Sequence, residues 1–253
     1  MPIPLQRTRH RTTTLLLALA ALLAGLFAAA PTAHAATPVY SGTGWRIDTA
    51  HGIHSLSPKP YVITFTDTAS RARLTPYAQA AASQLTSVTG TTFTVTTTIE
   101  TPPAVGSCPT EHHVILGVKY RPTGTKGMSH AWNCFTNRPG QIDYHAAWGG
   151  WAWIDSEYWS TSSWFSTNST VNSAKVKNAV THEIGHTIGL THPNKDLDKD
   201  GVVEPYECAK TTYGYLPVLC SPSGGYTTAT GGGQFTSRDT PGLRQLVANY
   251  GLG

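Results

Sequence analysis

Few folds can accommodate residues 182–192, which read His-Glu-Ile-Gly-His-Thr-Ile-Gly-Leu-Thr-His. Side chains four positions apart on a helix lie one turn above each other, so His182 and His186 can bind one zinc ion. Glu183 then lies beside the metal, where it can take a proton from water. A continued helix would carry the third histidine to another face, and Gly189 can adopt the left-handed conformation that turns the chain first. The sequence therefore predicts a catalytic zinc ion with three ligands, His182, His186 and His192, and Glu183 as general base.

The alternative for this segment is a pair of histidines packed in a hydrophobic core. At 100° per residue, Val180 and Ile184 lie on one apolar stripe of the helix. His182 and His186 point well away from that stripe. The periodicity therefore favours the metal site.

With this motif the chain resembles the metzincin clan of zinc endopeptidases, of the secreted bacterial type. The resemblance implies an α+β fold: a twisted mixed sheet backed by two helices, a zinc cleft, and an irregular C-terminal part with a final helix. It also implies hydrolysis of peptide bonds in protein or peptide substrates. Two other interpretations remain open. One is a zinc hydrolase that acts on something other than a peptide. The other is a secreted module that is stabilised by zinc and calcium and binds glycan or peptide through aromatic residues.

The family places a methionine-containing turn under the metal, and this chain departs from it. After the leader the only methionine is Met128, which precedes the motif. The best candidate for the turn is residues 217–225, with Leu219 in the place of methionine at little cost in volume. The resemblance makes Tyr226 a candidate oxyanion stabiliser, and a packing role is its alternative.

Hydrophobic periodicity and turn residues predict the elements around the motif. A strand at 61–65 is followed by a helix that begins with Thr75 as cap and ends at Gly90. The further elements are strands at 92–96 and 113–118, two possible strands at 141–145 and 151–155, a helix at 172–190 capped by Asn172 or Ser173, and a helix at 240–250 capped by Asp239 or Thr240.

Residues 196–207 match the calcium-loop pattern D-x-D-x-D-G-x5-E. Five of the chain's 14 acidic residues lie in these twelve positions, where they repel one another without a cation. A solvated acidic loop is the alternative. The pattern predicts one structural calcium ion held by Asp196, Asp198, Asp200, the Val202 carbonyl, Glu204 and Glu207.

The first 35 residues have the features of a cleaved secretory signal: Arg7, Arg9 and Arg11, an apolar run over 15–30, and Ala-His-Ala at 33–35. A membrane anchor is the alternative, but sixteen apolar residues are short for a span. We expect a secreted, extracellular protein with an irregular arm or short processed segment at 36–59 and a catalytic domain at 60–253. An exported protein would oxidise its four cysteines to two disulfides, and of the three connectivities the local pairing is preferred: Cys108 with Cys134 and Cys208 with Cys220.

Charge and composition bear on the partners. Removal of the leader leaves 15 basic and 14 acidic side chains, so a nucleic-acid partner is not supported. We expect a monomer without a membrane partner after signal cleavage. An aromatic cluster precedes the motif and suits either packing or a binding surface: Trp148, Trp151, Trp153, Tyr158, Trp159, Trp164 and Phe165.

Overall fold

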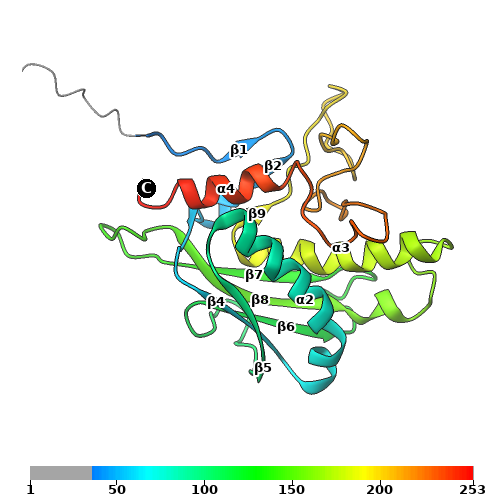
Figure 1. Ribbon diagram of the computed structural model, residues 1–253. Coiled ribbons are helices and arrows are strands. Elements are labelled where there is room, and N and C mark those ends of the chain that lie inside the picture. Colours follow the sequence, from blue (N-terminus) through cyan, green and yellow to red (C-terminus); the bar gives the residue numbers. More distant parts are fainter. Residues whose placement is uncertain (1–35, 253) are drawn as a thin grey trace, which may run out of the picture. The chain divides into compact units, whose positions relative to one another are not determined.

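A mixed, twisted β-sheet with helices against it is the centre of the computed structural model, which describes residues 36–252 (Figure 1). Strands β3, β8, β6, β4 and β5 lie in that order and pair in parallel, and β7 runs antiparallel to β8. The architecture is consistent with the expected α+β class. The strands are β3 (Ser55–Leu56), β4 (Tyr61–Phe65), β5 (Phe93–Ile99), β6 (His113–Lys119), β7 (His130–Phe135) and β8 (Ala146–Asp155).

Three of the predicted strands are confirmed as β4, β5 and β6, and the one at 151–155 is the second half of β8. The strand predicted at 141–145 is wrong, because these residues form turns. Strand β7 was not predicted, since its sequence, His-Ala-Trp-Asn-Cys-Phe, has no β-branched residue and no clear alternation.

Helix α2 (Thr68–Thr89) begins seven residues before the predicted cap at Thr75. Asp67 is the cap, and its carboxylate accepts a hydrogen bond from the Ser70 amide at 2.8 Å. Thr75 instead lies inside the helix, where its hydroxyl donates to the Arg71 carbonyl at 2.6 Å. The helix ends as predicted at Gly90, which has a φ of 73°.

Helix α3 (Ser169–Thr187) carries the first part of the motif and is capped by Asn168 rather than by Asn172 or Ser173. Its end lies before Leu190, because that residue belongs to strand β9 (Leu190–Thr191). Helix α4 (Thr240–Ala248) begins as predicted and ends two residues early. Asp239 precedes α4, but its side chain forms no capping bond to that helix.

Residues 36–59 differ from the expected irregular arm. They contain β1 (Ser41–Gly42), β2 (Trp45–Ile47), the 3-10 helix η1 (Thr49–His51) and β3. Strand β2 pairs with β1 and with β9, which makes a three-stranded antiparallel sheet. Ile47, Ile53 and Leu56 have 0% exposure, so the segment belongs to the core, and the compact unit begins at Thr37 rather than near residue 60.

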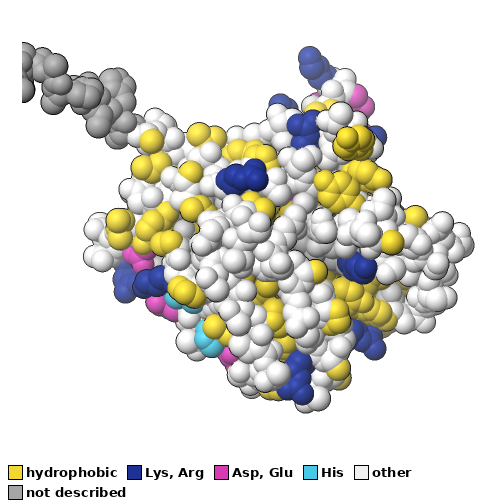
Figure 2. Space-filling model, viewed as in Figure 1, with side chains coloured by type: hydrophobic (Ala, Val, Ile, Leu, Met, Phe, Trp, Pro, Cys, Tyr) yellow, Lys and Arg dark blue, Asp and Glu magenta, His cyan; other side chains and the backbone are white. Residues whose placement is uncertain are grey.

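The two helices α2 and α3 pack against each other and against the sheet, and α4 packs on β2 and β3 (Figure 1). The apolar stripe of α3 is buried as the periodicity predicts, with Val180 and Ile184 at 0% exposure. In the view of Figure 2, Lys and Arg side chains are spread over the face and do not gather in one large patch.

The cysteines form the two disulfides of the preferred pairing, Cys108–Cys134 and Cys208–Cys220. Both bonds fit an extracellular protein. No helix within residues 36–252 has the length and apolar character needed to span a bilayer. The predicted signal segment at 1–35 lies outside the described residues.

Candidate metal centre

Three imidazoles converge at the end of α3. The Nε2 atom of His186 lies 2.9 Å from that of His182, and the Nε2 atom of His192 lies 3.1 Å from each of them. Gly189 makes the turn that brings in the third ring, with a φ of 104°. The sequence motif thus places three ligand atoms around one point, where they could hold a metal ion.

The Nδ1 atoms of His182 and His186 determine how these two rings are oriented. His182 Nδ1 lies 2.7 Å from the Val218 carbonyl, and His186 Nδ1 lies 2.9 Å from the Leu190 carbonyl. A carbonyl only accepts, so each Nδ1 carries the proton and each Nε2 presents a lone pair. Two lone pairs at 2.9 Å repel unless a proton or a cation lies between them, so the donor set suits a metal ion.

Protonation of the three rings is disfavoured. Burial lowers the pKa of His182 well below its ordinary value, and the neighbouring His186 and His192 lower it further. Burial is also the main cause of the lowered pKa of His186 and of the fall in the pKa of His192 to about 4. Neutral imidazoles are the form that binds a metal, so this site is prepared for one near neutral pH.

Glu183 lies next to the first ligand and is 7% exposed. Burial raises the pKa of its carboxyl group to about 8. A divalent cation beside the group would act in the opposite direction, because positive charge favours the carboxylate. The residue therefore combines a buried setting with a place in the chain next to the first ligand.

The turn at residues 217–225 lies under the histidines. A Cβ atom on Gly185 would come within 2.9 Å of Leu219 Cδ2, so the leucine side chain contacts the helix between His182 and His186. Leu219 is 1% exposed. The candidate turn thus supplies both an apolar floor and, through Val218, the carbonyl that orients His182.

Asp239 holds this turn, a role that was not predicted from the sequence. Its carboxylate accepts hydrogen bonds from the amides of Val218 at 2.9 Å and Leu219 at 3.1 Å. The same group accepts from the amide and hydroxyl of Thr236, both at 2.7 Å. A carboxylate just before a helix is usually interpreted as a cap, so the sequence offered no signal for these longer-range bonds.

The side chain of Asn194 ties the segment of the third ligand to the same turn. Asn194, two residues after His192, donates to the Ser221 carbonyl at 2.6 Å and accepts from the Ser221 amide at 2.8 Å. The chain is therefore held against the turn just before the acidic loop begins.

The five acidic side chains of that loop form two overlapping groups of three. Within each group, one carboxylate oxygen per residue lies within 4.8 Å of the others. Within the loop, backbone amides already donate to several carboxylates, including Gly201 to Asp196 at 2.9 Å and Glu204 to Glu207 at 2.9 Å. Burial and the neighbouring Glu207 raise the pKa of Glu204. The groups could hold a metal ion: Asp196, Asp198 and Glu207 in one, Asp198, Asp200 and Glu204 in the other.

Tyr226 lies beyond the turn and is half-buried. Its ring packs edge to face on Tyr215, with centroids 5.1 Å apart, and its carbonyl accepts from Asn178 at 3.0 Å. Both contacts are structural, and its oxyanion role stays a prediction.

The aromatic cluster is largely a packing layer. Trp148, Trp151 and Tyr158 are less than 10% exposed. Cations cover two of the more exposed rings, Arg73 over Trp159 at 5.0 Å and Lys126 over Trp164 at 5.1 Å. These contacts favour packing over a sugar-binding platform.

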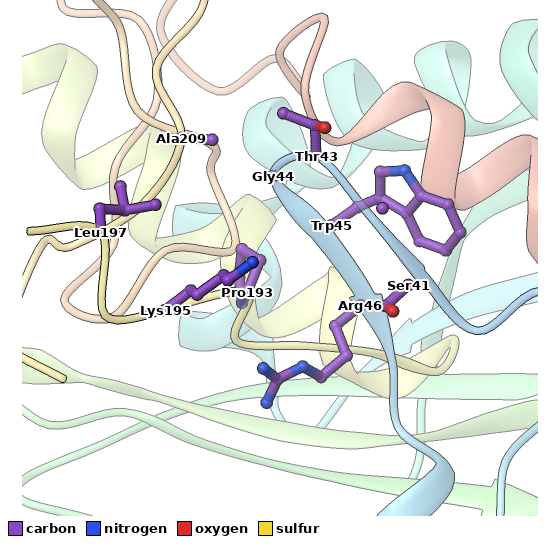
Figure 3. Close-up of a pocket in the computed structure, with 10 residues that line it drawn as sticks. Ser41, Thr43, Gly44, Trp45, Arg46, Pro193, Lys195, Leu197 and Ala209 are labelled. Carbon is purple, nitrogen blue, oxygen red and sulfur yellow. The ribbon is translucent and has the colours of Figure 1, made fainter. Parts of the chain in front are cut away.

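A cavity of about 350 Å³ lies between the β1–β2 hairpin and the segment that follows His192 (Figure 3). Arg46 and Lys195 contribute the charged side chains to its wall, and Trp45, Pro193 and Leu197 contribute apolar surface. The three candidate ligands do not line it.

Comparison with known protein families and with curated proteins finds none that matches this chain.

Proposed function

We propose that the chain is a secreted zinc-dependent endopeptidase of the metzincin type. The observation that carries the proposal is the combination of three neutral imidazoles converging on one point with a buried glutamate next to the first of them. Structural zinc sites are usually closed by four protein ligands, whereas three ligands leave a position for water or substrate. The turn with Leu219 under the helix supports the same assignment.

Zinc held by His182, His186 and His192 would supply a Lewis acid that makes water acidic near neutral pH and polarises the scissile carbonyl. Glu183 accepts the proton of the attacking water and passes it to the leaving amine as the peptide bond breaks. The Val218 and Leu190 carbonyls keep both helix histidines in the tautomer that presents Nε2. Hydrolysis by this route forms no covalent intermediate with the protein.

The test is hydrolysis of casein by the purified protein, beside Glu183→Gln and beside Glu111→Gln as a matched control. Glu111 is exposed, and within residues 36–252 its one ion pair is a long one to Arg138 at 3.9 Å. Zinc per chain is measured in all three. We expect cleavage by the parent and the control, about one zinc in each sample, and a loss of at least about 100-fold in kcat for Glu183→Gln.

Two results would count against the proposal. Full activity in Glu183→Gln would exclude this residue as the base. A parent that holds one zinc but cleaves neither casein nor a mixed peptide library would favour the binding module.

A further inference from the structure

A buried carboxylate lies where the N-terminal segment meets the metal centre. Asp48, immediately before η1, is 7% exposed. Asn133 on β7 donates its Nδ2 hydrogen to Asp48 Oδ2 at 2.9 Å, and His51 Nδ1 lies 2.8 Å from Asp48 Oδ1. Two elements distant in sequence thus hold one charged group in place.

The same residue is bonded to the turn between the second and third ligands. The Asp48 amide donates to the Gly189 carbonyl at 2.9 Å, and the Gly189 amide donates to the His186 carbonyl at 3.1 Å. Beside this turn, a Cβ atom on Gly189 would come within 2.6 Å of Ile53 Cγ2. The segment that carries Asp48 therefore packs directly on the chain that delivers His192.

The pairing of β2 with β9 keeps Asp48 next to the ligands. Ile47 pairs with Leu190, and the Asp48 amide bonds to Gly189, which lies three residues from both His186 and His192. The side chains of Arg46 and His51 on the same segment are exposed, so solvent screens their charges more than it screens the buried carboxylate.

A divalent ion bound by three neutral imidazoles keeps both of its positive charges, and burying uncompensated charge is costly. Glu183, next to His182 in the chain, supplies one negative charge. A second carboxylate, held by hydrogen bonds beside the turn that joins His186 to His192, would bring the formal charge of the site to zero. In the described part of the chain, Asp48 is the buried acid that is bonded to this turn.

We propose that Asp48 is a positioning residue of the metal centre: its carboxylate, fixed by Asn133 of β7, compensates the charge of bound zinc, and its backbone amide holds the Gly189 turn between the ligands. The inference rests on the zinc site of the proposed function and is independent of peptide hydrolysis.

The experiment measures the zinc dissociation constant of the full protein by competition with a chromophoric chelator. Asp48→Asn keeps the shape of the side chain and removes its charge, and we expect zinc binding at least about tenfold weaker than in the parent. Glu111→Gln is the matched control, because it makes the same change of acid to amide at an exposed position; we expect binding within about twofold of the parent. The melting temperature of Asp48→Asn should fall further below that of the parent in saturating zinc than in chelator.

Asn133→Ala keeps the proposal testable if Asp48→Asn does not fold. It removes one of the two side chains that hold the carboxylate, and we expect zinc binding severalfold weaker. Unchanged zinc affinity in Asp48→Asn, or in Asn133→Ala when the first variant does not fold, would overturn the inference. A parent that binds no zinc would instead refute the proposed function itself, while a parent that binds zinc and cleaves casein leaves that function standing whatever Asp48 does.

Discussion

At the scale of single residues, the candidate metal centre depends on side chains outside the set of three histidines. Leu219 fills the space under α3 between two ligands, and Asp239 fixes the backbone of the turn that carries it. The ligands can keep their geometry only while this floor stays in place. Changes to the floor should therefore affect stability and zinc affinity together.

Leu219→Ala tests the floor. Removing a fully buried leucine side chain leaves a cavity, and we expect a loss of about 2–5 kcal/mol in the free energy of unfolding, measured by urea denaturation. Zinc affinity should fall as well, because His182 and His186 lose the packing between them. Leu219→Met is the control, since it conserves volume and should cost less than about 1.5 kcal/mol. A stable Leu219→Ala variant with unchanged zinc affinity would contradict this role.

At the scale of elements, the acidic loop and the third ligand belong to one segment. His192, Asn194 and the loop follow one another, and Asn194 is fixed to the turn at Ser221. The Cys208–Cys220 disulfide joins the far end of the loop to the same turn. An ion in the loop would order the segment that carries His192.

Calcium removal is the test of that coupling. With zinc saturating, addition of a calcium-selective chelator should lower the melting temperature, and excess calcium should restore it. Asp198→Asn, which removes an acid shared by both candidate groups, should reduce the response to calcium, whereas Glu111→Gln should not. If chelation changes neither the melting temperature nor the zinc content, the loop is only a solvated acidic loop.

The parts of the site that could be predicted from the sequence are those whose geometry is local. The spacing of His182, His186 and His192 needs only a helix and one turn, and the acidic loop is contiguous. The parts that could not be predicted join distant positions: Asp48 and Asn133 are 85 residues apart. Strand β7 and the N-terminal hairpin were missed for a related reason, because both are short, weakly patterned elements stabilised by the strands they pair with.

At the scale of the whole molecule, two half-buried histidines outside the metal centre, His54 and His145, link stability to pH. The rings of His54 and His145 lie 4.1 Å apart, where the N-terminal segment meets β8, and Tyr40 packs on His54 at 5.0 Å. Burial lowers the pKa of His54, and the charge of His145 lowers it further. The folded protein therefore binds a proton at His54 less readily than the unfolded chain does.

The sign of the pH dependence follows from that difference. Above about pH 6.5 both states hold His54 neutral. As the pH falls below this value the unfolded state binds the proton first, so stability decreases until the folded-state pKa is also passed. We expect the free energy of unfolding, measured in fixed excess zinc, to fall less steeply between pH 6.5 and pH 5 in His54→Asn than in the parent. Identical slopes in parent and variant would exclude this pair as a contributor.

The pairing of β2 with β9 has a consequence for how the protein is made. Ile47 pairs with Leu190, so one of the first strands to leave the ribosome waits for its partner until most of the chain has been synthesised. The third ligand lies beyond that partner, and no shorter nascent fragment contains the complete donor set. A chain exported unfolded would cross the membrane without metal and would acquire it only on the far side, after β2 and β9 had paired.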